Sequence, residues 1–235
     1  MIGHRGAPAA APENTLSAFA AALAANVDGV EFDVRLTRDS RLVVMHDDDV
    51  SRTTDGTGCI SAMTLDEVRT LRLKGARAER VPTFDEVVAL VHARVRMYVE
   101  LKTSWCNGVF SSAEPVARAL APRLAALDAT VSSSDHTAVE LVRALEPRAR
   151  TAVTIARGGD VRDAIRSITG HAEVHISSDD ADATSVDAAH AAGLEVLVWT
   201  VNEPARAREL QRLGVDGIFT DDPVAIASVS GGGDD

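Results

Sequence analysis

The chain has 235 residues, of which 46% are hydrophobic, 25% are charged and only 3% are aromatic. This composition is typical of a folded globular protein whose core is built from Ala, Val, Leu and Ile. The formal net charge of −11 argues against nucleic acid and anionic membrane surfaces as partners, because both are bound through basic patches. A small phosphodiester is compatible with this charge if its site supplies local positive charge. No stretch approaches the ~20 apolar residues of a membrane span.

The chain ends and the cysteines give expectations about cellular location and redox state. The first residues lack the charged and then apolar pattern of an export signal, so we expect a cytoplasmic protein. Cys59 and Cys106 are too few for a disulfide framework and form no CxxC pair, so we expect two free thiols, as in reducing compartments. Residues 230–235 contain no apolar side chain and are expected to be disordered. The oligomeric state is left open.

Short apolar runs alternate with amphipathic stretches along the whole chain. A first run over 2–4 precedes a helical pattern over 14–26, and a hairpin with arms 30–36 and 42–46 follows. Further strands are predicted over 97–101, 130–133, 151–155, 174–177, 194–200 and 217–220. Helices are predicted over 83–91, 113–127, 137–145, 160–168, 185–192 and 204–213. Asn14, Thr83 and Ser185 are the expected N-caps, and Gly193 and Gly214 the expected helix ends.

Alternation of strands and helices predicts parallel strands joined by right-handed crossovers. With the hairpin counted as one position there are eight strands, which favours a TIM (β/α)8 barrel. A doubly wound open sheet is the alternative, because alternation alone does not establish closure. The polar residues 47–80, with a helical patch at 65–71, form an insertion after strand 2 that is expected to act as a partial lid. We therefore predict a single barrel domain over residues 1–229.

Three carboxylates lie in or at the ends of predicted strands. Glu31 and Asp33 are two residues apart, so both side chains point to one face of their strand, and Glu100 ends a later apolar run. Inward carboxylates on neighbouring strands need a compensating cation to stay ionised together. Oxygen ligands without thiolates favour Mg²⁺ or Ca²⁺. The alternative interpretation is a set of separate, solvated charges.

Two histidines are expected at the same end of the barrel. His4 follows the first strand and His46 ends the hairpin, and a pair of imidazoles can divide the roles of general acid and general base. Arg5 and Lys102 lie beside these groups and offer positive charge to a phosphate. The remaining histidines are interpreted as structural: His92, His136, His171, His175 and His190.

Several short motifs occur in a fixed order over residues 2–226, and together they resemble the glycerophosphodiester phosphodiesterase family. The motifs are His4–Gly6, Pro12–Thr15, Glu31–Thr37, Val44–Asp47, Glu100–Lys102, Val198–Asn202 and Asp216–Asp221. A single tripeptide of this kind would be weak support, whereas the ordered series is specific. One position departs from the family pattern, because Ser134 stands where the family often has an aromatic residue.

The resemblance implies a TIM barrel that hydrolyses glycerophosphodiesters to glycerol 3-phosphate and an alcohol. It implies that Glu31, Asp33 and Glu100 hold the metal. His4 and His46 would be the acid–base pair, with Arg5 and Lys102 at the phosphate. Trp199 would line the glycerol side. Glu13 and Asn14 would lie at the pocket rim or support His4, and Asp47 would only shape its turn.

Two other functions are weighed against this one. A related barrel phosphodiesterase that cleaves lipids would need apolar loops near the mouth, and the insertion at 47–80 has few apolar residues. An inactive barrel that only binds phosphorylated ligands would have lost a histidine or a carboxylate, and none is missing from the motifs. The motifs leave open which histidine is the base. They also leave open whether water or the substrate's own hydroxyl attacks phosphorus first.

Overall fold

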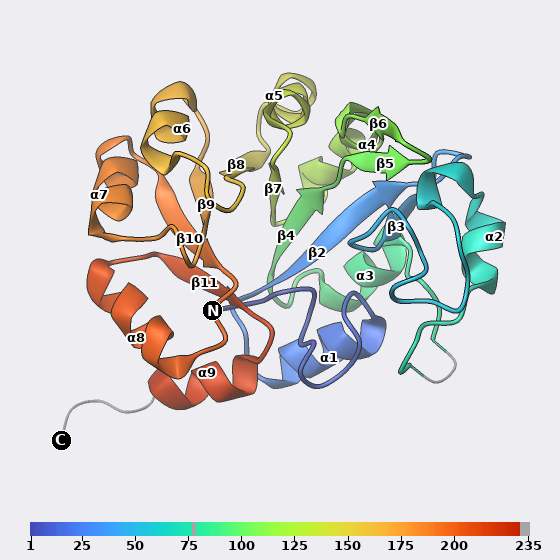
Figure 1. The fold of residues 1–235 in the computed structure, drawn as a ribbon, viewed down its shortest axis with the longest axis horizontal. Coiled ribbons are helices and arrows are strands. Elements are labelled where there is room, and N and C mark those ends of the chain that lie inside the picture. The colour runs from blue at the N-terminus through green and yellow to red at the C-terminus, as the bar shows by residue number, and fades with distance from the viewer. Residues whose placement is uncertain (77–78, 231–235) are drawn as a thin grey trace.

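Eight parallel strands close into a barrel in the computed structural model of the protein, which describes residues 1–76 and 79–230 (Figure 1). β1 pairs with both β2 and β11, and these two contacts join the ends of the sheet. The open doubly wound sheet is thereby excluded, and the predicted TIM barrel is confirmed. In spatial order the strands are β1 (Ile2–Gly3), β2 (Gly29–Leu36), β4 (Arg96–Leu101), β7 (Ala129–Ser133), β8 (Arg150–Thr154), β9 (Glu173–Ser177), β10 (Glu195–Trp199) and β11 (Gly217–Thr220).

Helices surround the barrel, as Figure 1 shows, and most of them match the predicted periodic segments. The last helix was not predicted, because the apolar segment after β11 was left unassigned. The expected disordered tail lies outside the described residues from 231 onward. The helices of the ring are α1 (Leu16–Ala24), α3 (Phe84–Val91), α4 (Glu114–Leu120), α5 (His136–Leu145), α6 (Val161–Ser167), α7 (Ala183–Ala191), α8 (Pro204–Leu213) and α9 (Pro223–Ser230).

Two of the predicted N-caps are wrong by a few residues. Thr15, not Asn14, caps α1, and its hydroxyl accepts from Ala18 N. Asp182 caps α7, and Ser185 is the third residue of the resulting capping box. Thr83 caps α3 as predicted, in a capping box with Glu86. The error at Asn14 is informative, because its side chain is used elsewhere, as described below.

The predicted helix over 113–127 divides into α4 and a 3-10 helix, η2 (Ala121–Ala126). Pro122 lies in the first turn of η2. A proline has no backbone N–H to donate to the preceding turn, so the α-helical hydrogen-bond ladder cannot continue through it.

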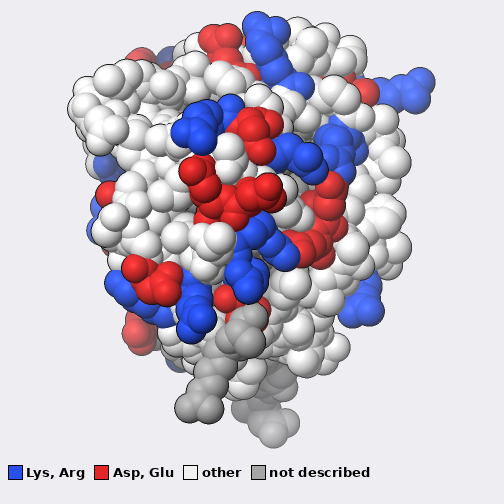
Figure 2. Space-filling model, turned by 90° about the vertical axis from the view of Figure 1, so that its right-hand side faces the viewer, with Lys and Arg blue, Asp and Glu red and all other residues white. Residues whose placement is uncertain are grey.

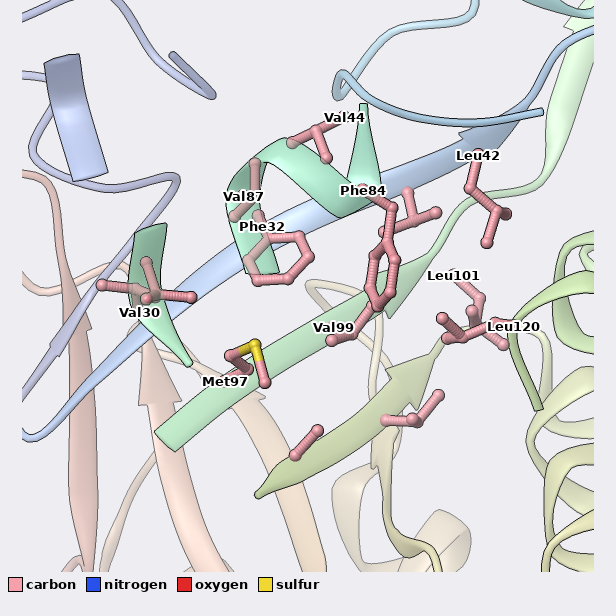
Figure 3. Close-up of a cluster of buried hydrophobic side chains, with 14 of the residues drawn as sticks. Val30, Phe32, Leu42, Val44, Phe84, Val87, Met97, Val99, Leu101 and Leu120 are labelled. Atoms are coloured by element: carbon pink, nitrogen blue, oxygen red, sulfur yellow. The ribbon is translucent and has the colours of Figure 1, made fainter. Parts of the chain in front are cut away.

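The face of β2 opposite the carboxylates packs against the helical layer. Val30, Phe32 and Val34 are fully buried there, and the Phe32 ring lies 6.1 Å from the ring of Phe84 on α3. Figure 3 shows Val30, Phe32 and Phe84 within the cluster of buried side chains between β2, β4 and α3. Because side chains alternate along a strand, burial of this apolar set turns Glu31 and Asp33 toward the barrel interior.

The insertion after strand 2 has a small core of its own. β3 (Leu42–Val44) pairs antiparallel with β2, which confirms the hairpin, and α2 (Leu65–Thr70) confirms the helical patch. A short 3-10 helix, η1 (Ile60–Ala62), lies between them. Figure 2 shows the side of the molecule that carries these elements, where basic and acidic side chains are intermixed. The buried apolar residues of this part are Val43, Met45, Val50, Ile60, Val68, Leu71, Leu73 and Val81.

The expectation of two free thiols is wrong. Cys59 in the insertion and Cys106 form a disulfide with a Cα–Cα distance of 5.8 Å. Cys106 belongs to an unpredicted hairpin, β5 (Ser104–Cys106) and β6 (Val109–Ser111), which follows β4. The two cysteines are 47 residues apart, so only the fold brings them together. The disulfide attaches the insertion to the segment that begins just after Lys102.

Candidate active site

The register between β2 and β4 brings the three predicted ligand residues together. Asp33 lies directly opposite Glu100 across this parallel pair, and Glu31 shares the inward face of β2 with Asp33. One ligand oxygen from each of the three lies within 4.8 Å of the others. The sequence therefore placed these carboxylates correctly, and they form one cluster.

This cluster forms part of a pocket at the carboxyl end of the barrel, where the two sides differ in chemistry. We call the set from the ends of β1, β2, β3 and β4 the ionic side, because it contains the Arg, Lys and Glu residues of the lining. We call the set from β7 to β11 the neutral side, because no Asp, Glu, Lys or Arg occurs among its lining residues. The ionic side contains His4, Arg5, Glu31, His46, Glu100 and Lys102. The neutral side contains Ser132, Thr154, His175, Trp199 and Phe219.

Two cations already lie against the carboxylates. Lys102 Nζ lies 3.1 Å from Glu100 and 3.4 Å from Asp33, and Arg5 Nε lies 3.3 Å from the second Asp33 oxygen. The Arg5 backbone N–H donates to Glu31 at 2.8 Å. Both predicted phosphate-binding residues thus line the pocket, while also compensating charge on Asp33.

The nearby positive charges compensate the negative charge of the carboxylates unevenly. Burial, together with the neighbouring Asp33 charge, raises the pKa of Glu31 to about 8. For Asp33 burial alone would raise the pKa, but Lys102 and Arg5 outweigh it and hold that pKa well below its ordinary value. Of the two carboxylates on β2, Glu31 is therefore the one whose ionised form has the greater need of another positive charge.

The cluster fits a divalent cation. The Glu31 Oε1 atom is buried and has no hydrogen-bond partner among the described residues. Asp33 Oδ1 also lacks a hydrogen bond within the described part of the chain, and Lys102 is its nearest cation. Buried unpaired carboxylate oxygens are costly, and oxygen-only donors suit Mg²⁺ or Ca²⁺. Asp48 also lies near the sulfur atoms of Cys59 and Cys106, but the disulfide removes both thiolates.

His4 is held by a carboxylate from the other end of the chain. Its Nδ1 lies 2.7 Å from Asp221, and Asn202 donates to the second Asp221 oxygen at 2.7 Å. An ionised carboxylate only accepts hydrogen bonds, so Nδ1 carries the hydrogen and Nε2 is left for the pocket. Asn202 and Asp221 lie within the sequence motifs, but their support of His4 was not predicted, because nothing in their spacing links them to His4.

His46 has the same arrangement with its neighbour. Its Nδ1 lies 2.7 Å from Asp47, so the interpretation of Asp47 as a turn residue alone is too limited. The buried Arg35 donates to the His46 carbonyl and, at 2.8 Å, to the Thr103 carbonyl. Arg35 therefore ties the segment that carries His46 to the end of β4. Adjacency of His46 and Asp47 in sequence was the signal that could have found this pair.

The pKa values of the two histidines shift in opposite directions. For His4, burial alone would lower the pKa, but the hydrogen bond with Asp221 and the charge of Glu31 raise it above its ordinary value. For His46, burial lowers the pKa, and the nearby Lys102 and Arg5 charges act in the same direction against the attraction of Asp33. Two imidazoles with pKa values moved apart are suited to different proton-transfer roles.

Glu13 and Asn14 were expected at the pocket rim or beside His4, but neither lines the pocket and neither is hydrogen-bonded to His4 within the described residues. Glu13 accepts from Arg5 at 2.9 Å and from Arg52. Asn14 donates to Asp33 at 2.8 Å, which explains why it is not the cap of α1. Both residues therefore position Arg5 and Asp33 instead.

The neutral side contains one of the histidines that were interpreted as structural. His175 was expected to be structural, but its ring lines the pocket, and its Nε2 lies 3.1 Å from the buried Glu173. Trp199 lines the pocket as predicted, and the buried Trp199 Nε1 and Thr154 Oγ1 have no partner within the described residues. Ser134 is exposed and lies outside the lining.

Two more of the histidines interpreted as structural lie in hydrogen-bonded pairs away from the pocket. His171 is bonded to Thr151 and Glu140, and His190 lies 3.0 Å from Asp216. No residue of the insertion lines the pocket within the described part of the chain, so the predicted partial lid stays a prediction.

Comparison with known proteins agrees with this geometry. The model of the glycerophosphoryl diester phosphodiesterase family matches residues 4–225. YhdW of Bacillus subtilis is 35% identical over 95% of this chain and 94% of its own. The glycerophosphodiester phosphodiesterase of Bacillus altitudinis is 31% identical over 95% and 94%. A phosphodiesterase structure from Oleispira antarctica, in complex with the product sn-glycerol-3-phosphate, has a TM-score of 0.87 and 31% identity over 98% of this chain and 96% of that one.

Proposed function

The chain belongs to the glycerophosphoryl diester phosphodiesterase family and is a phosphoric diester hydrolase, and we propose a metal-dependent, histidine-assisted mechanism for its pocket. The substrates are small glycerophosphodiesters, and the products are glycerol 3-phosphate and an alcohol. The observation that carries the proposal is the pair of histidines, each with a carboxylate at Nδ1, beside a carboxylate cluster with an unpaired oxygen.

In this proposal Glu31, Asp33 and Glu100 hold Mg²⁺ or Ca²⁺, which supplies positive charge at the phosphoryl oxygens. Arg5 and Lys102 bind the phosphate from the protein side. Such fixed cations stabilise charge that develops in the transition state and need no reorganisation during the reaction. Trp199 and its neighbours on the neutral side contact the glycerol.

The opposite pKa shifts support a division of roles. His46, whose pKa is lowered by burial, is neutral near pH 7 and acts as the base toward the attacking hydroxyl or water. His4, whose pKa is raised through Asp221 and Glu31 against the effect of burial, acts as the acid toward the leaving oxygen. Metal binding at Glu31 would reduce that carboxylate's influence on His4, whereas the hydrogen bond with Asp221 would persist.

A coupled assay for glycerol 3-phosphate tests the proposal. It compares several head groups, with and without a chelator. Release of glycerol 3-phosphate from each small glycerophosphodiester, lost on chelation, is the expected result. Undiminished release after exhaustive chelation would exclude the metal. The proposed products require cleavage between phosphorus and the head-group oxygen, so release of a phosphorylated head group would exclude that assignment.

One observation favours lipid cleavage as a second candidate. The β5–β6 hairpin begins two residues after Lys102 and exposes Trp105, Val109 and Phe110, with exposed fractions of 65%, 64% and 57%. Apolar loops near the mouth are the feature that a lipid substrate would use. The same assay with lysophospholipids separates the two candidates, because a lipid enzyme would turn these over faster than glycerophosphocholine.

The expected cytoplasmic location stays a prediction. Within the described residues, no helix is long and apolar enough to cross a membrane. The Cys59–Cys106 disulfide counts against the prediction, because disulfides are rare in reducing compartments. Labelling of free thiols in intact cells before lysis would test it, since a cytoplasmic protein should be labelled at both cysteines.

A further inference from the structure

Arg52 joins two carboxylates that each hold a residue of the ionic side. Its Nη1 and Nη2 donate to Glu13 at 2.8 and 2.6 Å, and its Nε donates to Asp47. All three guanidinium nitrogens are thus used. Arg52 lies in the insertion, whose described residues do not line the pocket.

Both partners of Arg52 continue into the site. Asp47 lies 2.7 Å from His46 Nδ1 through its other oxygen. Glu13 accepts from Arg5 at 2.9 Å, and Arg5 in turn lies 3.3 Å from Asp33. One uninterrupted series of contacts therefore runs from a histidine to the metal-binding cluster, and Arg52 is its midpoint.

The backbone that carries Arg52 is well fixed. Val50 is fully buried in the core of the insertion. Lys74 donates from its side chain to the Ser51 carbonyl at 2.6 Å and from its backbone to the Thr53 carbonyl at 2.8 Å. The guanidinium is therefore presented from a rigid support and does not depend on a free loop end.

An ordinary surface ion pair is the alternative explanation, since the Arg52 side chain is 49% exposed and exposed pairs contribute little. Two features distinguish Arg52 from such a pair. Its planar fork binds Glu13 through two parallel hydrogen bonds, a geometry that a lysine cannot reproduce. Its two carboxylate partners are not free, because each is already committed to a pocket residue.

We propose that Arg52 is a positioning residue that sets the separation between the His46–Asp47 pair and the Glu13–Arg5 pair. The insertion would thereby contribute to turnover without touching the substrate. Without the guanidinium, the carboxylates of Glu13 and Asp47 lose their shared counter-charge and repel each other. Asp47 then no longer holds His46 with Nε2 toward the pocket. This inference rests on the proposed function, because it assigns His46 and Arg5 their roles.

The test compares Arg52→Gln with Arg52→Lys and with a control, Arg69→Gln. Arg69 also lies in the insertion and pairs bidentately with Glu86, at 2.6 and 2.9 Å, but contacts no pocket residue. We expect Arg52→Gln to lower kcat for glycerol 3-phosphate release by about tenfold or more, the usual cost of losing an orienting partner. KM should change much less, Arg52→Lys should recover part of the loss, and Arg69→Gln should keep wild-type kcat.

A double variant isolates the route through Asp47. In an Asp47→Ala background, Arg52→Gln should lower kcat by clearly less than it does in the wild type, because the carboxylate that Arg52 holds against His46 is already absent. Equal effects of Arg52→Gln in both backgrounds, or an equal kcat loss in Arg69→Gln, would overturn the proposal.

A second readout does not depend on activity. Nitrogen chemical shifts of the His46 ring report which nitrogen carries the hydrogen. We expect Nδ1–H in the wild type and a mixture of tautomers in Arg52→Gln, whereas an unchanged ring would refute the positioning role. If the wild type releases no glycerol 3-phosphate but Arg52→Gln still changes the tautomer of the His46 ring, the proposed function fails and the positioning role of Arg52 stands.

Discussion

The two sides of the pocket are built on different principles. On the ionic side, opposite charges lie against each other, Arg5 and Lys102 against Asp33, but the buried Glu31 Oε1 has no hydrogen-bond partner within the described residues. On the neutral side, two buried polar atoms, Thr154 Oγ1 and Trp199 Nε1, have no partner among the described residues. Both sides therefore keep unused capacity, but of different kinds: the free carboxylate oxygen of the ionic side suits a cation, whereas the free hydroxyl and indole N–H of the neutral side suit a hydroxyl of the substrate.

The largest effects should come from the histidines. His4→Ala and His46→Ala should each lower turnover by roughly 10²-fold or more, the scale of lost acid–base catalysis. Their thermal midpoints should change little, because side chains at the carboxyl ends of barrel strands are seldom placed for stability. Turnover assays and thermal melts measure both quantities.

His190→Ala is the matched control, since His190 also pairs with an aspartate, Asp216, but lies away from the pocket. It should retain wild-type turnover. An unfolded rather than inactive His4 or His46 variant would show that the histidine is structural.

The uneven charge compensation predicts a pH dependence of stability in the metal-free protein. Burial raises the pKa of Glu31 from an ordinary value of 4.5 to about 8. At a pH between these two values, Glu31 is protonated in the folded state and ionised in the unfolded state. Stability must therefore fall as pH rises through that window. We expect the free energy of unfolding, measured by urea titration in chelator, to fall by more than about 1 kcal/mol between pH 5 and pH 8.

The same titration of Glu31→Gln provides the comparison, because the amide cannot titrate. Its decrease in stability over the window should be clearly smaller. Identical slopes for the two proteins would mean that Glu31 is ionised in the folded state without metal.

Substitutions on the neutral side should have a smaller effect on activity than those of the histidines, and only on substrates that contain glycerol. Thr154→Val and Trp199→Phe each remove one unpaired polar atom while keeping much of the side-chain volume. We expect kcat/KM for glycerophosphocholine to fall by about tenfold, since a site that hydrogen-bonds a hydroxyl discriminates through that contact. Hydrolysis of bis(p-nitrophenyl) phosphate, which has no glycerol, should be unaffected. Equal losses on both substrates would assign these residues to the chemistry or to folding.

The smallest expected effect concerns the head group. Specificity constants for glycerophosphoethanolamine and glycerophosphocholine should lie within about tenfold, or ~1.4 kcal/mol in transition-state binding. The reason is that Ser134, where an aromatic residue was expected, is exposed and lies outside the pocket lining, so it offers the leaving alcohol no specific contact. Ser134→Phe should sharpen the preference and leave the metal requirement intact. A wild-type enzyme with one strongly preferred head group, or with lysolipids as its better substrates, would refute this view.

Local spacing explains which parts of this structure the sequence could predict. Periodicity identified the barrel strands, and the two-residue spacing of Glu31 and Asp33 placed them on one face because side chains alternate along a strand. Contacts between distant segments carry no such signal. Asp221 is 217 residues from His4, and the two disulfide cysteines are 47 residues apart. The place of His175 in the pocket lining was not predicted for a related reason, since only closure of the barrel turns β9 toward the pocket.

The most direct test of the ionic side is activity before and after metal removal. Glycerol 3-phosphate release should be abolished by exhaustive chelation and restored by Mg²⁺ or Ca²⁺. Glu100→Gln, with one neutral ligand in place of a carboxylate, should need a higher metal concentration for half-maximal recovery, by about tenfold or more. Full activity in the chelated wild type, or an unchanged metal requirement in Glu100→Gln, would contradict the assignment of this carboxylate cluster as the metal site.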